Sequence, residues 1–183
     1  ADGAAAGDTA FLDPGFVAAA ARTPGVARTS TQRVRALSLD PARPAVVLIA
    51  RPLDDVAREL PMVGDAVPVP AGRIPIYVSE AMVDLYGARP GQDFTPLARA
   101  LGQPQVAFHV AGVWRDYARQ SGAVMMDAAA FRQLTGDERV NDLLLWLAPG
   151  ADAAANANLN GVTNADFVAG GTMLMTGTRH FRH

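Results

Sequence analysis

Apolar and polar residues alternate in short runs along this chain, and the runs predict strands and short helices in turn. Residues 26–39 form the longest run, and its alternation changes phase. Val34 and Ala36 face one side, and then Leu37 and Leu39 take the other. Because the side chains of a strand alternate between its two faces, we expect a β-bulge or a change of packing partner within this strand.

Two runs are apolar at every position and predict central strands that are buried on both faces. They are AVVLIA at residues 45–50 and LLLWL at residues 143–147. Their burial on both faces suggests that they are neighbours in one sheet. Further strands are predicted at residues 74–78, 106–111 and 123–126, of which the second alternates and is therefore expected to be half-buried.

Three predicted helices each follow a short polar residue of the kind that caps the first turn of a helix. Pro at the first helical position and Gly after the last turn support the first and the second of them. The helices begin after Asp13, Ser79 and Asp127, and they end at residues 23–25, at Gly87 and at residues 135–137.

The remaining segments carry weaker patterns. Residues 51–73 are rich in Pro, Asp and Gly, and we place a crossing between two subdomains there, with at most a short helix at residues 53–60. Residues 1–10 are small and polar and predict a disordered lead-in. Asp152 is a candidate cap for an alanine-rich helix, and residues 162–168 are a candidate final strand. Residues 169–183 are a closing strand, a tail, or a stretch that lies beside residues omitted from this sequence.

Composition narrows the class of protein. The chain has 183 residues, half of them hydrophobic, which is enough to bury the core of one domain or of two small ones. Its formal net charge of −2 leaves no basic excess to neutralise phosphates, so we expect no nucleic-acid partner. The lack of Cys excludes a disulfide framework, Cys-ligated metals and thiol catalysis. No apolar run approaches the roughly 20 residues that span a bilayer.

The histidines are poor candidates for catalysis or metal binding. His109 lies on a predicted strand, opposite the apolar face, which is typical of a surface or subdomain-interface histidine. His180 and His183 lie close together near the C-terminus, but no obvious third and fourth metal ligands accompany them.

Other catalytic groups are equally poorly supported. The aspartates are scattered, and we expect no acid–base pair among them. Ser79 follows a strand and opens a helix, as the nucleophilic serine of an α/β-hydrolase does. Its neighbours Val78 and Glu80, however, are not the small residues that the tight turn of a nucleophile elbow needs. There is no phosphate-binding loop and no lysine. We therefore expect no catalytic residue, no metal and no cofactor.

One polar and aromatic cluster, residues 114–120, is a candidate contact for a partner. Trp, Tyr and Arg dominate the binding energy of protein interfaces. The alternative is that Trp114 and Tyr117 anchor the loop to the core. The candidate contact residues are Trp114, Arg115, Tyr117 and Arg119.

Four stretches together resemble the extracytoplasmic domain of FtsX-like and MacB-type ABC transporter permeases. The stretch IPIYVSEAMVDLYGARPGQDF is similar to the strand of that family that leads into a helix and a Gly-x-x-x-Gly turn. The stretch VAGVWRDYARQSGAVMMDAAAFRQLTGD is similar to its Gly-Val strand, loop and Asp-initiated helix. The resemblance covers roughly residues 11–153, and residues 154–183 match nothing in the pattern. The stretches are FLDPGFVAAAARTPGVARTSTQRV, IPIYVSEAMVDLYGARPGQDF, VAGVWRDYARQSGAVMMDAAAFRQLTGD and VNDLLLWLAPGAD.

The resemblance implies an α+β fold with mixed sheets and short helices in two subdomains, the MacB-like periplasmic core whose parts are called porter and sabre. On this basis we expect residues 11–73 and 139–168 to form the first subdomain and residues 74–138 to be inserted into it. Residues 1–10 then precede the fold and residues 169–183 follow it.

The resemblance also implies a location and a function. The domain would lie on the periplasmic or extracytoplasmic face of the bacterial inner membrane, attached to the transmembrane helices of its parent permease. A cytoplasmic ATPase subunit would move those helices, and the domain would pass the motion to a periplasmic partner or to a lipid, lipoprotein or peptide cargo. The alternatives are a free-standing periplasmic binding or adaptor module, and a small hydrolase with converging Ser, His and Asp side chains.

Overall fold

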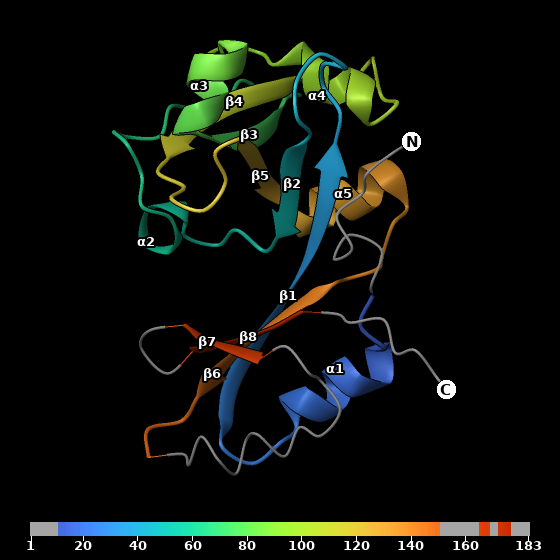
Figure 1. The fold of residues 1–183 in the computed structure, drawn as a ribbon, viewed down its shortest axis with the longest axis vertical. Coiled ribbons are helices and arrows are strands. Elements are labelled where there is room, and N and C mark those ends of the chain that lie inside the picture. Colours follow the sequence, from blue (N-terminus) through green and yellow to red (C-terminus); the bar gives the residue numbers. More distant parts are fainter. Residues whose placement is uncertain (1–10, 151–164, 169–171, 177–183) are drawn as a thin grey trace. The chain divides into compact units, whose positions relative to one another are not determined.

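The computed structural model describes residues 11–150, 165–168 and 172–176, and the chain divides into two compact units (Figure 1). The second unit is residues 35–138, and the first contains the described residues on either side of it. Residues 35–73, which we expected in the first subdomain, therefore belong to the second unit. The reason is strand pairing, because Val47 to Arg51 pair in parallel with residues 123–127 deep inside the second unit.

The first unit is an antiparallel sheet with one helix. Its strand order is β1-β6-β8-β7, and each neighbouring pair is antiparallel. The candidate strand at residues 162–168 corresponds to β7, and the closing-strand alternative for residues 169–183 corresponds to β8. The bounds are α1 Pro14–Ala21, β1 Val26–Leu37, β6 Asp142–Leu147, β7 Ala165–Val168 and β8 Thr172–Thr176.

Helix α1 begins where the sequence predicts. The Asp13 carboxylate accepts a hydrogen bond from the backbone N–H of Phe16 at 3.0 Å, and Pro14 occupies the first turn. The helix buries Ala20 against Leu143 and Leu145 of β6. The expected lead-in at residues 1–10, the helix after Asp152 and the pair His180 and His183 lie outside the described residues.

The change of phase in β1 marks a change of packing partner. Residues from Val26 to Gln32 pair with β6 in the first unit. The division between the units then falls after Val34, and Leu37 packs in the core of the second unit with Val46. The phase change therefore reflects a change of packing partner, which is one of the two explanations that the sequence offered. The β1–β6 pairing also has a register irregularity, but it lies elsewhere, between Val26 and Arg28.

The second unit is a mixed sheet in the order β4-β3-β5-β2, after which β1 follows. The pairs β2–β5 and β3–β4 are parallel, and β3–β5 is antiparallel. Our prediction that residues 45–50 and 143–147 are neighbours is wrong, because β2 pairs with β5 whereas β6 pairs with β1 and β8. The bounds are β2 Val46–Arg51, β3 Ile74–Ser79, β4 Phe108–Trp114 and β5 Ala123–Asp127.

Both faces of this sheet are covered. Three helices supply Met82, Leu97 and Phe131 to the core on one face. A short helix and the segment around it cover the other face, where Ile49 and Trp114 are buried. We did not predict α4, although Pro96 lies in its first turn; the residue before the helix, Phe94, is not a capping residue. The helices are α2 Val56–Glu59, α3 Glu80–Tyr86, α4 Thr95–Ala100 and α5 Ala128–Thr135.

Strand β4 is buried along its whole length, whereas the sequence predicted a half-buried strand. One edge pairs with β3, and two irregular segments cover the other edge. Residues 91–94 bond to Phe108 and Val110, and residues 61–67 bond to residues 111–115. Because both faces of the sheet are covered as well as both edges of the strand, every position of β4 is shielded, although β4 ends the strand order.

Candidate functional site

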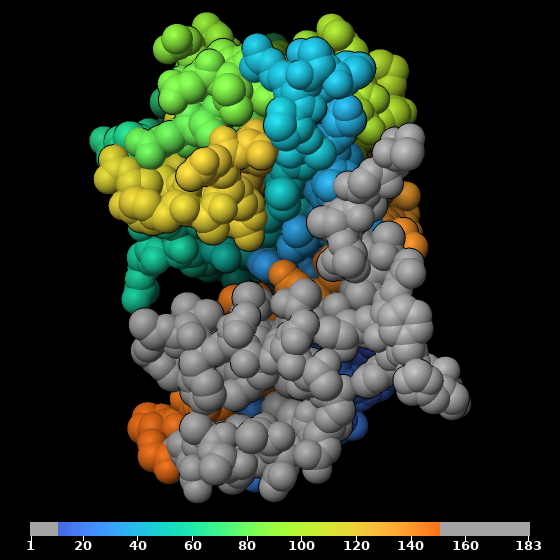
Figure 2. All heavy atoms as spheres, viewed as in Figure 1, coloured from blue at the N-terminus to red at the C-terminus, as the bar shows by residue number. Residues whose placement is uncertain are grey.

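Most of the predicted contact cluster, residues 114–120, lies in the loop that connects β4 to β5. We call this loop, residues 115–122, the contact loop; it lies at the carboxyl ends of the parallel strands β3 and β4. Its start is fixed by a hydrogen bond from the Arg115 N–H to the Pro61 carbonyl at 3.0 Å. Figure 2 shows the loop on the surface of the second unit next to α3, to which an ion pair between Arg115 and Glu80 ties it.

The two aromatic residues that the sequence singled out have opposite environments. Trp114 is 4% exposed and packs in the core with Ile49, Leu60 and Met125. Tyr117 is 82% exposed, the most exposed of the large hydrophobic side chains in the described ranges. The anchoring alternative therefore describes Trp114, while the Tyr117 ring is presented to solvent.

The arginines of the contact loop are oriented by carboxylates. Arg115 Nε lies 3.2 Å from Glu80 Oε2, and hydrogen bonds to Glu80 and Tyr117 raise the pKa of Arg115. Arg119 Nη1 lies 2.9 Å from Asp116 Oδ2. Asp116 also accepts the Ala118 N–H at 2.9 Å, which tightens the turn beneath Tyr117. The loop thus carries paired charges around one exposed ring.

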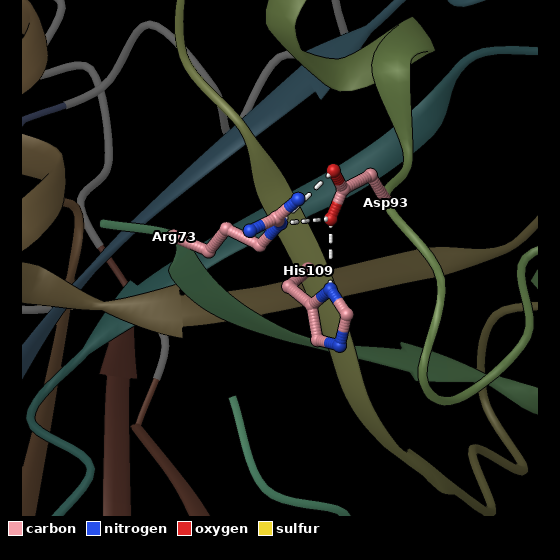
Figure 3. Close-up of polar contacts among 3 residues, drawn as sticks. All are labelled: Arg73, Asp93 and His109. Atoms are coloured by element: carbon pink, nitrogen blue, oxygen red, sulfur yellow. Dashed lines mark hydrogen bonds and ion pairs between the residues drawn. The ribbon is translucent and has the colours of Figure 1, made fainter. Parts of the chain in front are cut away.

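A second cluster lies at the amino end of β3 and β4, where Arg73 and His109 both point at the carboxylate of Asp93 (Figure 3). Asp93 Oδ1 lies 2.7 Å from His109 Nδ1 and 2.9 Å from Arg73 Nε. His109 comes from β4, Arg73 from the turn before β3, and Asp93 from the segment that covers the outer edge of β4.

His109 is buried, contrary to our expectation of a surface or interface histidine. The covering segment around Asp93 shields it and supplies its partner. The hydrogen bond with His109 has the largest effect and lowers the pKa of the Asp93 carboxyl. Desolvation opposes it, and the hydrogen bond and charge of Arg73 add to the lowering, so the pKa of Asp93 stays below its usual range. Asp93 is therefore a carboxylate at neutral pH.

Ser79 is not placed to act with this histidine. His109 pairs with Pro75, and Ser79 lies four residues further along β3, which corresponds to about 13 Å at the rise of a strand. The Ser79 hydroxyl instead accepts the buried N–H of Ala123 at 3.0 Å. Ser79 precedes α3 as predicted, but its side chain makes no capping bond and links β3 to the start of β5.

Asp127 does cap its helix, as the sequence predicted. Its carboxylate accepts the N–H groups of Ala129 at 3.1 Å and Ala130 at 3.3 Å. It also lies 3.4 Å from the N–H of Leu53. Asp127 is thereby assigned a structural role.

The described residues were also compared with the requirements of a metal site and of a membrane-spanning helix. In the ranges that the structure describes, no group of three or more His, Asp or Glu side chains is arranged to hold a metal ion. Within the same ranges, no helix has the length and apolar character needed to cross a membrane.

The cluster of Arg73, Asp93 and His109 and the ion pair between Glu80 and Arg115 were not found from the sequence. The partners are separated by 16 residues in His109–Asp93 and by 35 in Arg115–Glu80, and each pair forms across two different elements. The only available signal was a His on a strand and an Asp after a Pro-Gly turn, which are common individually.

No protein-family model and no curated protein sequence matches this chain. Solved structures share its fold. One is the crystal structure of the extracellular domain of the noncanonic ABC-type transporter YknZ from Gram-positive bacteria, with a TM-score of 0.55 and 12% identity over 81% of this chain and 79% of that one. Another is the periplasmic region of MacB from Actinobacillus actinomycetemcomitans, with a TM-score of 0.52 and 12% identity over 82% of this chain and 72% of that one. The chain therefore has the α+β fold of these transporter domains, as the sequence resemblance predicted.

Proposed function

We propose that this chain is the extracytoplasmic domain of an ABC transporter permease of the FtsX/MacB type. In this role it is not an enzyme. It is attached to the transmembrane helices of its parent permease, on the outer face of the bacterial inner membrane. ATP hydrolysis by a cytoplasmic subunit moves those helices, and the domain passes the movement to a partner or cargo outside the cytoplasm.

The observation that carries this proposal is the shared fold. Both neighbours described above are extracytoplasmic parts of ABC-type transporters, and the likeness extends over about four fifths of this chain. Fold alone is a weak guide to function, because one fold hosts many activities. Here the resemblance of roughly residues 11–153 to the FtsX-like family, which was drawn from the sequence, supports the same assignment.

The contact loop is the part of the second unit that we assign to partner binding. Tyr117 is almost fully exposed, and the flanking Arg115 and Arg119 are held in place by Glu80 and Asp116. Pre-oriented side chains lose less conformational entropy on binding, and Tyr and Arg are enriched among residues that dominate interface energy. The partner is a protein, or a lipid, lipoprotein or peptide cargo, that is presented outside the cytoplasm.

The test uses the full-length gene product in its native membrane. Protease added to intact spheroplasts is expected to digest this domain, and washing with high salt is expected to leave the protein in the membrane fraction. Release of the protein into the periplasmic fraction would favour a free-standing adaptor and would contradict the permease assignment.

The contact loop is tested separately, with a photo-crosslinking amino acid at position 117 and, as a control, at the exposed Arg99 of α4. Crosslinks that form at position 117 and change with ATP, but do not form at position 99, are expected. Equal crosslinking at both positions would remove the assignment of this loop while leaving the permease assignment intact.

A further inference from the structure

The described part of the chain concentrates its buried polar groups at one place. Of the six polar or charged residues that are buried there, four lie within the first unit next to the division between the units. A buried polar group is costly unless it is hydrogen-bonded, so this concentration reflects a specific arrangement. The four residues are Gln32, Arg33, Asn141 and Asp142.

Asn141 replaces a backbone partner for Val34. Its side-chain Oδ1 accepts the Val34 N–H at 2.6 Å, and its Nδ2 donates to the Val34 carbonyl at 2.8 Å. A primary amide carries the same donor and acceptor as a peptide group, so it completes the pairing of β1 at the point where the backbone ladder with β6 has ended at Gln32 and Asp142.

A second hydrogen-bonded contact between the same two segments, called the second tie, lies further into the first unit, at Gln32. Gln32 Nε2 donates to Asp142 Oδ2 at 2.7 Å in a buried environment, and the Asn141 N–H donates to the Gln32 carbonyl at 3.1 Å. On the same two segments, the guanidinium groups of Arg33 and Arg139 both lie over the ring of Phe11, at 4.8 and 4.3 Å from its centre.

These contacts join the only two places where the chain passes between the units. The first passage is from Val34 to Arg35, and the second is from Glu138 to Arg139. Val34 is the last residue before one passage, and Asn141 is the third residue after the other. We propose that Asn141, Gln32 and Asp142 form a clamp that makes the two passages move as one, so that bending between the units is confined to the residues beyond the clamp.

The proposal goes beyond the transporter assignment and does not depend on it, because the 183-residue chain alone can be tested. The chain has no Cys, so Ala18→Cys and Arg99→Cys, one exposed position in each unit, create unique sites for spin labels. Distances between the labels are measured by pulsed electron spin resonance, with and without Asn141→Ser. Amide hydrogen exchange is measured on the same proteins without labels.

Asn141→Ser removes both amide contacts to Val34 and is expected to broaden the distance distribution. It is also expected to speed exchange of the Val34 amide about ten-fold, because that N–H loses its acceptor. Ser79→Ala is the control, because it removes a buried hydrogen bond within the second unit, one bond where Asn141→Ser removes the two amide contacts to Val34. It is expected to leave the distribution unchanged.

The proposal is overturned if the distribution keeps its width while Val34 exchange accelerates, or if Ser79→Ala broadens it equally. A wild-type distribution as broad as that of the variant also overturns it. Gln32→Ala removes the second tie and keeps the Asn141 amide, so it carries the same test if Asn141→Ser does not fold.

Discussion

The Nδ1 atom of His109 lies 2.7 Å from Oδ1 of Asp93, and the backbones of the same two residues form an antiparallel β-bridge. The side-chain contact and the backbone contact therefore hold one segment against the outer edge of β4. Arg73 adds a second charged donor to the same carboxylate at 2.9 Å.

Asp93→Asn is expected to change how stability depends on pH. The pKa of Asp93 is lowered on folding, so its carboxylate stabilises the folded state above the unfolded pKa near 3.9, and this contribution is lost as pH falls below it. Thermal melts should show a difference between wild type and variant that is present at pH 5 and shrinks towards pH 3. The exposed Asp54→Asn serves as a control, and parallel curves for wild type and Asp93→Asn would contradict the expectation.

Trp114→Ala and Tyr117→Ala are expected to differ strongly in stability. Removing the buried indole of Trp114 should lower the free energy of unfolding by about 3–5 kcal/mol. Removing the exposed ring of Tyr117 should change it by no more than about 0.5 kcal/mol. Urea unfolding followed by circular dichroism measures both, and a large loss for Tyr117→Ala would show that the loop anchors through this residue.

Ser79 substitutions distinguish a helix cap from a link between strands. Ser79→Ala leaves the buried Ala123 N–H without its acceptor and should cost about 1–3 kcal/mol. Ser79→Asp would be tolerated at an ordinary cap, but here it buries a carboxylate at a position that is 1% exposed. We expect Ser79→Asp to be less stable than Ser79→Ala in chemical unfolding, and the opposite order would restore the capping role.

Gly122→Ala is expected to combine two penalties. The φ angle of Gly122 is +104°, and an added Cβ would lie 2.5 Å from the sulfur of the buried Met82. The backbone conformation costs about 1–2 kcal/mol and overpacking about 1–3 kcal/mol. Gly72→Ala, at φ +79° with open space around the added Cβ, carries the first penalty alone. Equal losses for the two variants in urea unfolding would mean that Met82 moves aside without cost.

Local features of the sequence predicted local structure well. Asp13 and Asp127 cap their helices, Gly87 ends α3 in the left-handed conformation, and the phase change in residues 34–39 coincides with the passage of β1 out of the first unit. Each of these depends on residues that are close in the chain, so a pattern of a few positions contains the necessary information.

Pairing between distant segments was not predictable in the same way. Burial on both faces identified the strand at residues 46–51, but it did not show that the neighbour is β5 and not β6. The sequence pattern also did not tell the buried Trp114 from the exposed Tyr117. The difference comes from the segment that covers the second face of the sheet, which buries Trp114 and leaves Tyr117 exposed. His109 and Asp93 meet for a similar reason, since the turn after Pro90 folds back along β4.

The clamp at Asn141 also has a consequence for how such a protein is assembled from parts. Because Val34 and Asn141 are hydrogen-bonded to each other, the two ends of the first unit that receive residues 35–138 lie side by side. A short turn is enough to close that gap. The second unit is therefore a cassette in the first, since its two ends leave and re-enter the first unit at one place.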